Sequence, residues 1–558
     1  MERLALPVAA GLAVLAHLLF FLGLFGWLRR GPVIALVILV HLLAIPDWRG
    51  LVRWRPQAPV AALFLLALAP LFLLALYPPT GFDETLYHLP MARAFAETGG
   101  LPFLPDLRVP VFPPLNEMLF AGMLLLSGDV AAHLVQLLAT LATAGLLAVW
   151  GQRLFPPAGG WIAASLFLGG PIVVHLAGTG YIEPGLTLFV TAALYSAWRF
   201  KETGKTGWLL AAALFAGSAA ATKYLGLFFA AAVFVVVAWG APRGRRLRNP
   251  LLYALASFAV LVPAYARIAA FTGNPIFPFL PGVFGASPWD PAHTVGAVSV
   301  GDAVIRLVRL PWNLVFDRVP VGWQPPFTPW LLAGLPLLAF GVARDSRVRR
   351  LALLPAVWAV VFLVLPADAR YLLPALPVLC LAFAGSAVLL FPRLPTLALC
   401  AALFLPGWLY AGYRMVRQGP LPATAGERDH YLAEHLPLYP AVRFLNRSAG
   451  SGYTAFGAHT ERMVYFAEGR LLGDYSSLAR YDRILPALGD PEALHHSLEK
   501  LGAGYLLLNR DLVAALPDTP PWRRRFRRVY ADGRGEVFVL VVAPPVGGGK
   551  SAPNRSRR

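Results

Sequence analysis

Long apolar runs recur along most of this chain, and short polar gaps separate them. The runs are about 16 to 25 residues long, and a helix of about 20 apolar residues crosses the hydrocarbon core of a bilayer. The pattern predicts thirteen membrane spans, near residues 4–28, 31–46, 58–78, 129–151, 158–176, 184–200, 207–222, 224–240, 250–268, 327–343, 350–366, 371–391 and 395–413. We therefore predict an all-α polytopic membrane domain over residues 1–415.

Basic residues predict the orientation of these spans. Six polar gaps that carry Lys or Arg fall on one side if the count is thirteen, at 47–56, 152–153, 199–205, 242–249, 343–350 and 392–393. Such gaps mark the cytoplasmic face. The segments 79–128 and 269–326, and everything after about residue 415, are then expected to face outward. Arg29 and Arg30 fall on the opposite side, so the orientation of the first hairpin stays open.

Composition agrees with a membrane protein, since 58% of the residues are hydrophobic and 14% are charged. The net charge of +19 reflects basic gaps between spans, which topology and anionic lipid explain, and no nucleic-acid partner is expected. Cys380 and Cys400 lie in predicted spans without metal-ligand or redox spacing. The first apolar run has no convincing cleavage site, so we expect a retained span.

The regions outside the spans have their own patterns. The first outward loop, 79–128, carries two amphipathic stretches, 88–99 and 113–126, which predict short helices along the membrane surface. Farther on, the strand-like segments 504–509 and 536–542 flank a helical pattern at 491–503, and we predict a small soluble α/β domain over residues 416–545. Residues 546–558, Gly-rich and then basic, are expected to form a disordered tail.

An acidic pair, Asp83 and Glu84, lies just beyond the apolar run that ends near residue 76. A helix at this point would stack Asp83 over Tyr87 and Glu84 over His88, one turn on. The pattern predicts a titratable cluster at the edge of the membrane.

Together, the architecture and a series of short motifs resemble the GT-C glycosyltransferases, in particular the protein O-mannosyltransferases and the lipid A aminoarabinose transferases. The motifs are FDETLYHLP at 82–90, FPPLNE at 112–117, TGYIEP at 179–184, ATKYLGL at 221–227, TGNPIFPF at 272–279 and ARYLLPALP at 369–377. Their order is stronger evidence than any one of them. The resemblance implies transfer of a sugar from a polyprenyl phosphate or pyrophosphate carrier to an acceptor at the outer face, usually with inversion.

The chain departs from the aminoarabinose transferases at two points. They tend to carry Lys before the Pro-Pro of the first loop, where this chain has Phe112, and Gly-Pro after the Thr-Lys pair, where it has Tyr224-Leu225-Gly226. The identity of the sugar and of the acceptor, whether glycan, lipid or protein, therefore cannot be carried over.

This chemistry needs a base for the acceptor hydroxyl and cations for the departing phosphate. We expect Asp83 to be the base, because desolvation near the bilayer raises the pKa of a carboxyl toward a useful range. The alternative is that Asp83 caps the helix beginning at Glu84. Glu84 is expected to orient the acceptor or the base, with an ordinary first-turn acid as the alternative.

Two cations are expected to bind the carrier phosphate. Lys223 lies at an outward turn between two spans, where an ammonium is expensive unless it meets an anion or water, and Arg370 immediately precedes a span. A snorkelling lysine and an interfacial arginine are the alternatives. Glu183 begins a span and is expected to pair with Lys223 or to hold the acceptor, unless it is an ordinary helix-start acid.

The other expected substrate-binding residues are Tyr87, His88, Arg93 and Arg267. His88 is interpreted as a packed or donor-bonding histidine in preference to a metal ligand, because the sequence shows no complete ligand set. Arg93 and Arg267 are outward cations, of a kind common at membrane edges. No metal site in the protein is predicted, although a pyrophosphate carrier would favour Mg or Mn, while Lys and Arg suffice for a monophosphate.

We predict a glycosyltransferase of a bacterial inner membrane, with a polyprenyl-linked sugar donor and its C-terminal domain in the periplasm or outside. A transporter or flippase, and a polymerase of lipid-linked saccharides, are the alternatives. Transporters place ionisable residues near the middle of the membrane and often show repeated halves, and this sequence shows neither. Convergence of Asp83, Lys223 and Arg370 on one outward-opening cavity would favour the enzyme.

Overall fold

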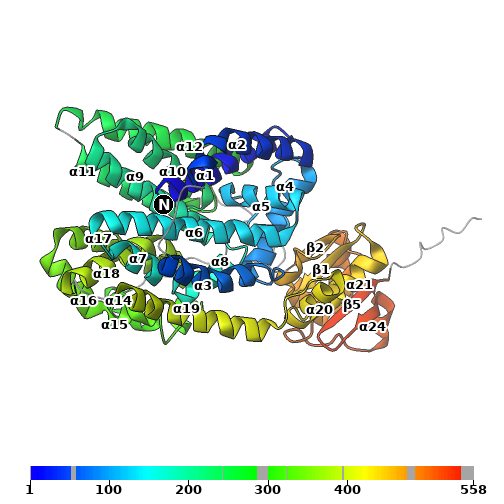
Figure 1. Ribbon diagram of the computed structural model, residues 1–558. Helices are drawn as coiled ribbons and strands as arrows, with labels where there is room; N and C mark the ends of the chain where they lie inside the picture. The colour runs from blue at the N-terminus through cyan, green and yellow to red at the C-terminus, as the bar shows by residue number, and fades with distance from the viewer. Residues whose placement is uncertain are drawn as a thin grey trace, which may run out of the picture. The chain divides into compact units, whose positions relative to one another are not determined.

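The computed structural model describes residues 2–51, 58–241, 243–285, 299–322, 324–391, 395–473 and 484–541. The expected tail at 546–558, the basic pair at 392–393 and part of the gap at 47–56 lie outside the described residues. The chain divides into two compact units, Met1–His435 and Leu436–Arg558. The first is helical and the second contains a sheet, as predicted (Figure 1).

Helices make up the first unit in the described part of the chain. They are α1 (Glu2–Leu24), α2 (Arg30–Leu51), α3 (Ala58–Ala75), η1 (Glu84–His88), α4 (Leu89–Thr98), α5 (Leu115–Leu126), α6 (Asp129–Leu154), α7 (Gly159–Leu168), α8 (Pro171–Ala177), α9 (Glu183–Thr203), α10 (Thr206–Thr222), α11 (Leu225–Gly240), η2 (Arg243–Arg245), α12 (Arg248–Thr272), α13 (Pro281–Phe284), α14 (Val300–Asn313), η3 (Val319–Val321), α15 (Pro329–Ala333), α16 (Leu335–Arg344), α17 (Ser346–Phe362), η4 (Ala369–Ala375), α18 (Leu376–Leu390), α19 (Thr396–Gln418) and α20 (Ala425–His435).

Every predicted span coincides with one helix or with a pair of helices, but the count of thirteen crossings is not confirmed. In the described residues, five helices are long and apolar enough to cross a membrane: Leu4–Leu24, Asp129–Leu154, Arg248–Thr272, Ala369–Leu390 and Thr396–Gln418. Several of the others are apolar but shorter, such as α10 and α11 with 17 and 16 residues.

The predicted span at 158–176 is broken. It forms α7 and α8, which bend by 69° at their junction, and the pair would count as a sixth crossing. Gly169 lies at the break, and a Cβ there would stand 1.9 Å from the carbonyl oxygen of Leu403 on α19. Pro171 then starts α8 at a position where its missing N–H costs nothing. The break therefore follows from a close approach of α19 and from the proline.

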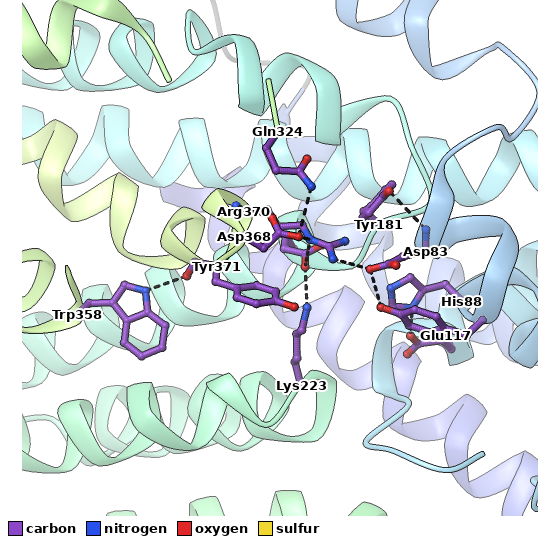
Figure 2. A network of polar contacts seen from close by, with 12 residues as sticks. Asp83, His88, Glu117, Tyr181, Lys223, Gln324, Trp358, Asp368, Arg370 and Tyr371 are labelled. Atoms are coloured by element: carbon purple, nitrogen blue, oxygen red, sulfur yellow. Dashed lines mark hydrogen bonds and ion pairs between the residues drawn. The ribbon is translucent and has the colours of Figure 1, made fainter. Parts of the chain in front are cut away.

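A buried group of helices holds the candidate site in place. α9 packs against α6 and α10, and all of its residues from Glu183 to Ala197 are buried. η4 packs against the same α9 and against α17. The two amphipathic stretches of the first outward loop form α4 and α5 as predicted, and they pack on each other. Consequently the start of α9, η4 and the first outward loop meet in one region (Figure 2).

The second unit contains a five-stranded sheet. In the described residues its strands are β1 (Thr454–Ala458), β2 (Arg470–Gly473), β3 (Tyr505–Asn509), β4 (Phe526–Ala531) and β5 (Gly535–Leu540). The described helices of this unit are α21 (Tyr439–Ala449), η5 (Glu461–Met463), η6 (Leu485–Gly489), α23 (Pro491–Lys500) and α24 (Pro520–Arg525). The order is β2-β1-β3-β5-β4, with β1 parallel to β2 and β3, and β5 antiparallel to β3 and β4. The strands expected near 504–509 and 536–542 and the helix near 491–503 are confirmed.

Candidate active site

Asp83 lies at the start of η1, with a side chain that is 13% exposed. Its Oδ2 accepts a hydrogen bond from the hydroxyl of Tyr87 at 2.8 Å and pairs with Nη2 of Arg370 at 2.5 Å. The predicted stacking of Asp83 on Tyr87 is therefore confirmed. The capping alternative is wrong, because the side chain of Asp83 accepts no hydrogen bond from the first turn of η1.

Glu84 and His88 lie at the two ends of η1, but the structure gives them different partners. One carboxylate oxygen accepts from the backbone N–H of Gly81 at 2.8 Å, and the other accepts from the N–H of Gly180 at 2.6 Å and contacts Nε2 of His133 on α6. The side chain is 1% exposed, and a carboxylate this deeply buried requires several donors. These contacts fasten η1 to α6 and to the loop between α8 and α9.

His88 pairs with a different acid. Its Nδ1 lies 2.6 Å from Oε1 of Glu117 on α5, and both side chains are at most 1% exposed. Rings of Tyr87, Phe112 and Tyr181 surround it, with centroids 4.2, 6.1 and 6.5 Å away. The other ring nitrogen, Nε2, is buried and has no hydrogen-bond partner among the described residues.

Arg370, on η4, is shared by three carboxylates. Its Nη2 pairs with Asp83, and its Nε lies 2.7 Å from Oδ2 of Asp368 (Figure 2). The same Nε lies 3.7 Å from Oε1 of Glu183. The side chain of Asp368 also accepts from the backbone N–H of Arg370 and so caps η4. The guanidinium lies over the ring of Tyr181, 4.8 Å from its centroid.

Lys223 follows the last residue of α10, where the backbone becomes extended. Its Nζ lies 2.6 Å from Oε1 of Glu183 and 4.7 Å from the ring centroid of Tyr371. The predicted pair between Lys223 and Glu183 is confirmed. A continuous row of ion pairs therefore runs from Asp83 through Arg370 and Glu183 to Lys223, which brings together residues that are far apart in the sequence.

The row of ion pairs corrects two expectations about Asp83, which are a raised pKa and a gap between this acid and the cations that would admit a hydroxyl. Direct contact with Arg370 leaves no space for a hydroxyl between the base and the cation. Burial raises the pKa of Asp83, but the charge of Arg370, followed by His88 and the Tyr87 hydroxyl, outweighs burial and holds this pKa below its usual value. The expected rise of the pKa is wrong because the sequence does not show that a guanidinium touches this carboxylate.

Two arginines that were predicted to bind substrate, Arg93 and Arg267, have other contacts. Arg93, on α4, is 30% exposed and pairs with Glu97 one turn on. Arg267, on α12, donates to the carbonyl oxygens of Leu101 and Pro102 in the first outward loop. Among the described residues Arg267 touches no carboxylate, so it fastens that loop to α12 and does not join the row of ion pairs.

Several residues of the site were missed in the sequence. Glu117, Tyr181 and Tyr371 lie inside motifs that carry the family resemblance, and Asp368 stands two positions before Arg370, so these positions contained a signal. His133 was recognisable as an ionisable side chain within a predicted span. In the described part of the chain, no group of three or more His, Cys, Asp and Glu is arranged to hold a metal ion.

Comparisons with known proteins agree with the fold and motifs. Residues 112–267 match the family model described as dolichyl-phosphate-mannose-protein mannosyltransferase, and residues 427–539 match the model described as SF2091/S2213. The uncharacterized protein SF2093/S2215 of Shigella flexneri is 30% identical over 183 residues, which are 31% of this chain and 90% of that protein.

Solved structures with this fold are also similar. ArnT from Cupriavidus metallidurans in the apo state has a TM-score of 0.58 and 16% identity, covering 86% of this chain and 98% of ArnT. ArnT bound to undecaprenyl phosphate has a TM-score of 0.53 and 18% identity, and the match covers 87% of this chain and 98% of ArnT. The apo oligosaccharyltransferase of Archaeoglobus fulgidus has a TM-score of 0.50 and 14% identity, and the match covers 84% of this chain and 73% of that protein. With its motifs, helical fold and C-terminal sheet unit, this chain belongs to the GT-C superfamily of membrane glycosyltransferases.

Proposed function

We propose that this protein transfers a sugar from a polyprenyl phosphate carrier to an acceptor at the outer face of a bacterial inner membrane. The observation that carries the proposal is the row of ion pairs, in which the predicted base touches a predicted phosphate ligand. ArnT, which shares the fold, binds undecaprenyl phosphate, and this supports a lipid monophosphate as the carrier.

Arg370 and Lys223 are the cations that the phosphate would meet. Nη1 of Arg370 is buried and has no partner among the described residues, so one donor of the guanidinium is free for a ligand. A phosphate accepts such a planar fork through two oxygens. Because Glu183 contacts both cations, it holds them side by side before the donor arrives.

Donor binding would also turn Asp83 into a base. A phosphate competes with Asp83 for Arg370, and once that pair weakens, burial raises the pKa of the carboxyl. Within the described residues both side-chain contacts of Asp83 use Oδ2, so Oδ1 is left to face the acceptor. The acceptor hydroxyl gives its proton to Asp83 and its oxygen bonds to the anomeric carbon. The bond from that carbon to the phosphate oxygen breaks, and its electron pair leaves on the phosphate.

The test incubates purified protein in lipid with a panel of polyprenyl-phosphate sugars and follows loss of sugar from the carrier. Asp83→Asn is expected to reduce kcat by about 10²- to 10⁴-fold, the range for losing a general base. Asp518→Asn is the control, because Asp518 is also an arginine-paired acid but lies exposed in the second unit. Equal turnover by Asp83→Asn would remove Asp83 from the mechanism.

Failure of the wild type on every donor would contradict the transferase assignment. Movement of the intact lipid-linked saccharide across a vesicle membrane would then identify a flippase.

A further inference from the structure

Two buried pairs of a histidine with a carboxylate flank Asp83, and they differ in one respect. In the pair of His133 with Glu84, both ring nitrogens are occupied, because Nε2 contacts Glu84 and Nδ1 lies 3.3 Å from the carbonyl oxygen of Ala75. In the pair of His88 with Glu117, only Nδ1 is occupied. In the first pair every ring nitrogen of the histidine has a hydrogen-bond partner, so the pair serves as a structural link. In the second pair Nε2 of His88 is buried and has no partner among the described residues.

The free nitrogen belongs to a ring beside Asp83. Tyr87 connects the two residues, since its hydroxyl donates to Asp83 and its ring centroid is 4.2 Å from that of His88. The carboxylates of Asp83 and Glu183 are both close enough to His88 to interact electrostatically. Among the described residues, the titratable or charged groups that face His88 are Asp83, Tyr87, Glu117, Tyr181 and Glu183. Figure 2 shows Asp83, Glu117 and Tyr181 around His88.

Hydrogen bonding to Glu117 prepares His88 to accept a proton. When Nδ1 donates its hydrogen to a carboxylate, the neutral ring carries its lone pair on Nε2. The same carboxylate stabilises the imidazolium that forms when Nε2 is protonated. Because both side chains are at most 1% exposed, a cation there would be costly without Glu117 beside it.

Asp83 needs such a neighbour after each turnover. When the phosphate leaves and Arg370 returns, the contact with Arg370 again favours ionised Asp83. A proton taken from the acceptor must then move to another group.

We propose that His88 and Glu117 form a proton-accepting pair that receives, at Nε2 of His88, the proton that Asp83 removes from the acceptor. The inference rests on the proposed function and deepens it. The proton leaves the acceptor oxygen for Asp83 and passes to Nε2, Asp83 becomes a carboxylate again, and the imidazolium finally gives the proton to water. No oxidant or reductant takes part, and charge is conserved at each step.

The test measures steady-state transfer by the full-length protein with the donor that the panel identifies. His88→Ala is expected to lower kcat about 10²-fold with KM for the donor little changed, and added imidazole is expected to restore part of kcat. Glu117→Gln still accepts the hydrogen bond from Nδ1 but cannot stabilise an imidazolium. We therefore expect it to fold normally and to lose kcat as well.

His133→Ala is the matched control. It removes the histidine of the structural link with Glu84, so it is expected to lower the unfolding temperature, and imidazole is not expected to raise its kcat. Wild-type kcat in either His88→Ala or Glu117→Gln, or a loss in His88→Ala that imidazole does not relieve, would overturn the proton-accepting pair and leave the transferase intact. Inactivity of the wild type on every donor would overturn the transferase and the pair together.

Discussion

At the scale of single residues, the site is a small set of charges that pair with one another. Two cations form ion pairs with three carboxylates. The cations are Arg370 and Lys223, and the carboxylates are Asp83, Glu183 and Asp368. Buried ion pairs add little net stability, because removing charges from water costs about as much as the pairing returns. Stability alone therefore does not explain why five ionisable side chains gather here. The proposed function accounts for the cluster, because a phosphate would exchange places with one of the acids.

Acid is expected to weaken the fold around Asp83. The pKa of this carboxyl lies below its ordinary value of 3.8, so the stability that its pairing contributes is fully present above that value and is lost as the pH falls through the lowered pKa. We expect the unfolding temperature of the wild type to fall more steeply with decreasing pH, below about pH 4, than that of Asp83→Asn. Thermal unfolding in detergent over a pH series measures the difference.

Asp518→Asn serves as the comparison. The pKa of Asp518 is also lowered, by its hydrogen bond to Arg523, but the pair is fully exposed and solvent screens it. The unfolding temperature of Asp518→Asn should therefore fall with decreasing pH as steeply as that of the wild type. Identical slopes for wild type and Asp83→Asn would show that the Arg370 contact contributes nothing to folding.

The sequence predicted which residues belong to the site better than which residues pair. Asp83, Glu183, Lys223 and Arg370 were recognisable because charges at the ends of apolar runs are expensive. Their partners depend on how distant segments pack, so local spacing did not indicate that Glu84 contacts His133 on α6. The lowered pKa of Asp83 was missed for the same reason, because it depends on contact with the distant residue Arg370.

At the scale of elements, hydrophobic patterning predicted the helices but not their breaks. Apolar runs coincide with helices throughout the described residues of the first unit, because backbone groups in an apolar region must bond within the segment. A run does not show whether another helix approaches closely enough to bend it. The junction of α7 and α8, where α19 touches Gly169, is such a place.

Gly169→Ala is expected to disrupt this junction. The new methyl carbon would stand 1.9 Å from the carbonyl oxygen of Leu403, which is backbone and cannot move without shifting α19. Overpacking of this kind costs roughly 1–3 kcal/mol or more. We expect a lower unfolding temperature, with reduced transfer because α8 leads directly to Tyr181 and Glu183.

Gly11→Ala provides the contrast for that measurement. Gly11 lies inside α1, and a Cβ there meets nothing within 4 Å among the described residues. Alanine favours a helix over glycine by about 1 kcal/mol, so this variant should be neutral or slightly stabilised. If the two variants unfold at the same temperature, close approach of α19 does not determine the break.

At the scale of the whole molecule, the second unit was predicted as a fold class but not as a topology. The segments that become β3 and β5 are almost wholly apolar, which made them visible in the sequence. The edge strand β4 contains Arg527 and Arg528 and reads as a basic loop, while β1 and β2 are short. Charged residues on an edge strand discourage pairing with other sheets. They also interrupt the apolar pattern from which a strand is predicted.

This second unit is expected to fold on its own. It is compact, and it has a core of its own in which β3 lies between β1 and β5 and presents Leu506 and Leu508 to a cluster with Leu494, Trp522 and Phe538. We expect a fragment of residues 436–541 to be soluble and monomeric, with mixed helix and strand by circular dichroism and one cooperative transition in urea. Leu506→Asp places a charge on a fully buried position and should abolish that transition, which links the measurement to this core. A fragment that melts gradually, or that Leu506→Asp leaves unchanged, would mean that the sheet depends on the helical unit for its stability.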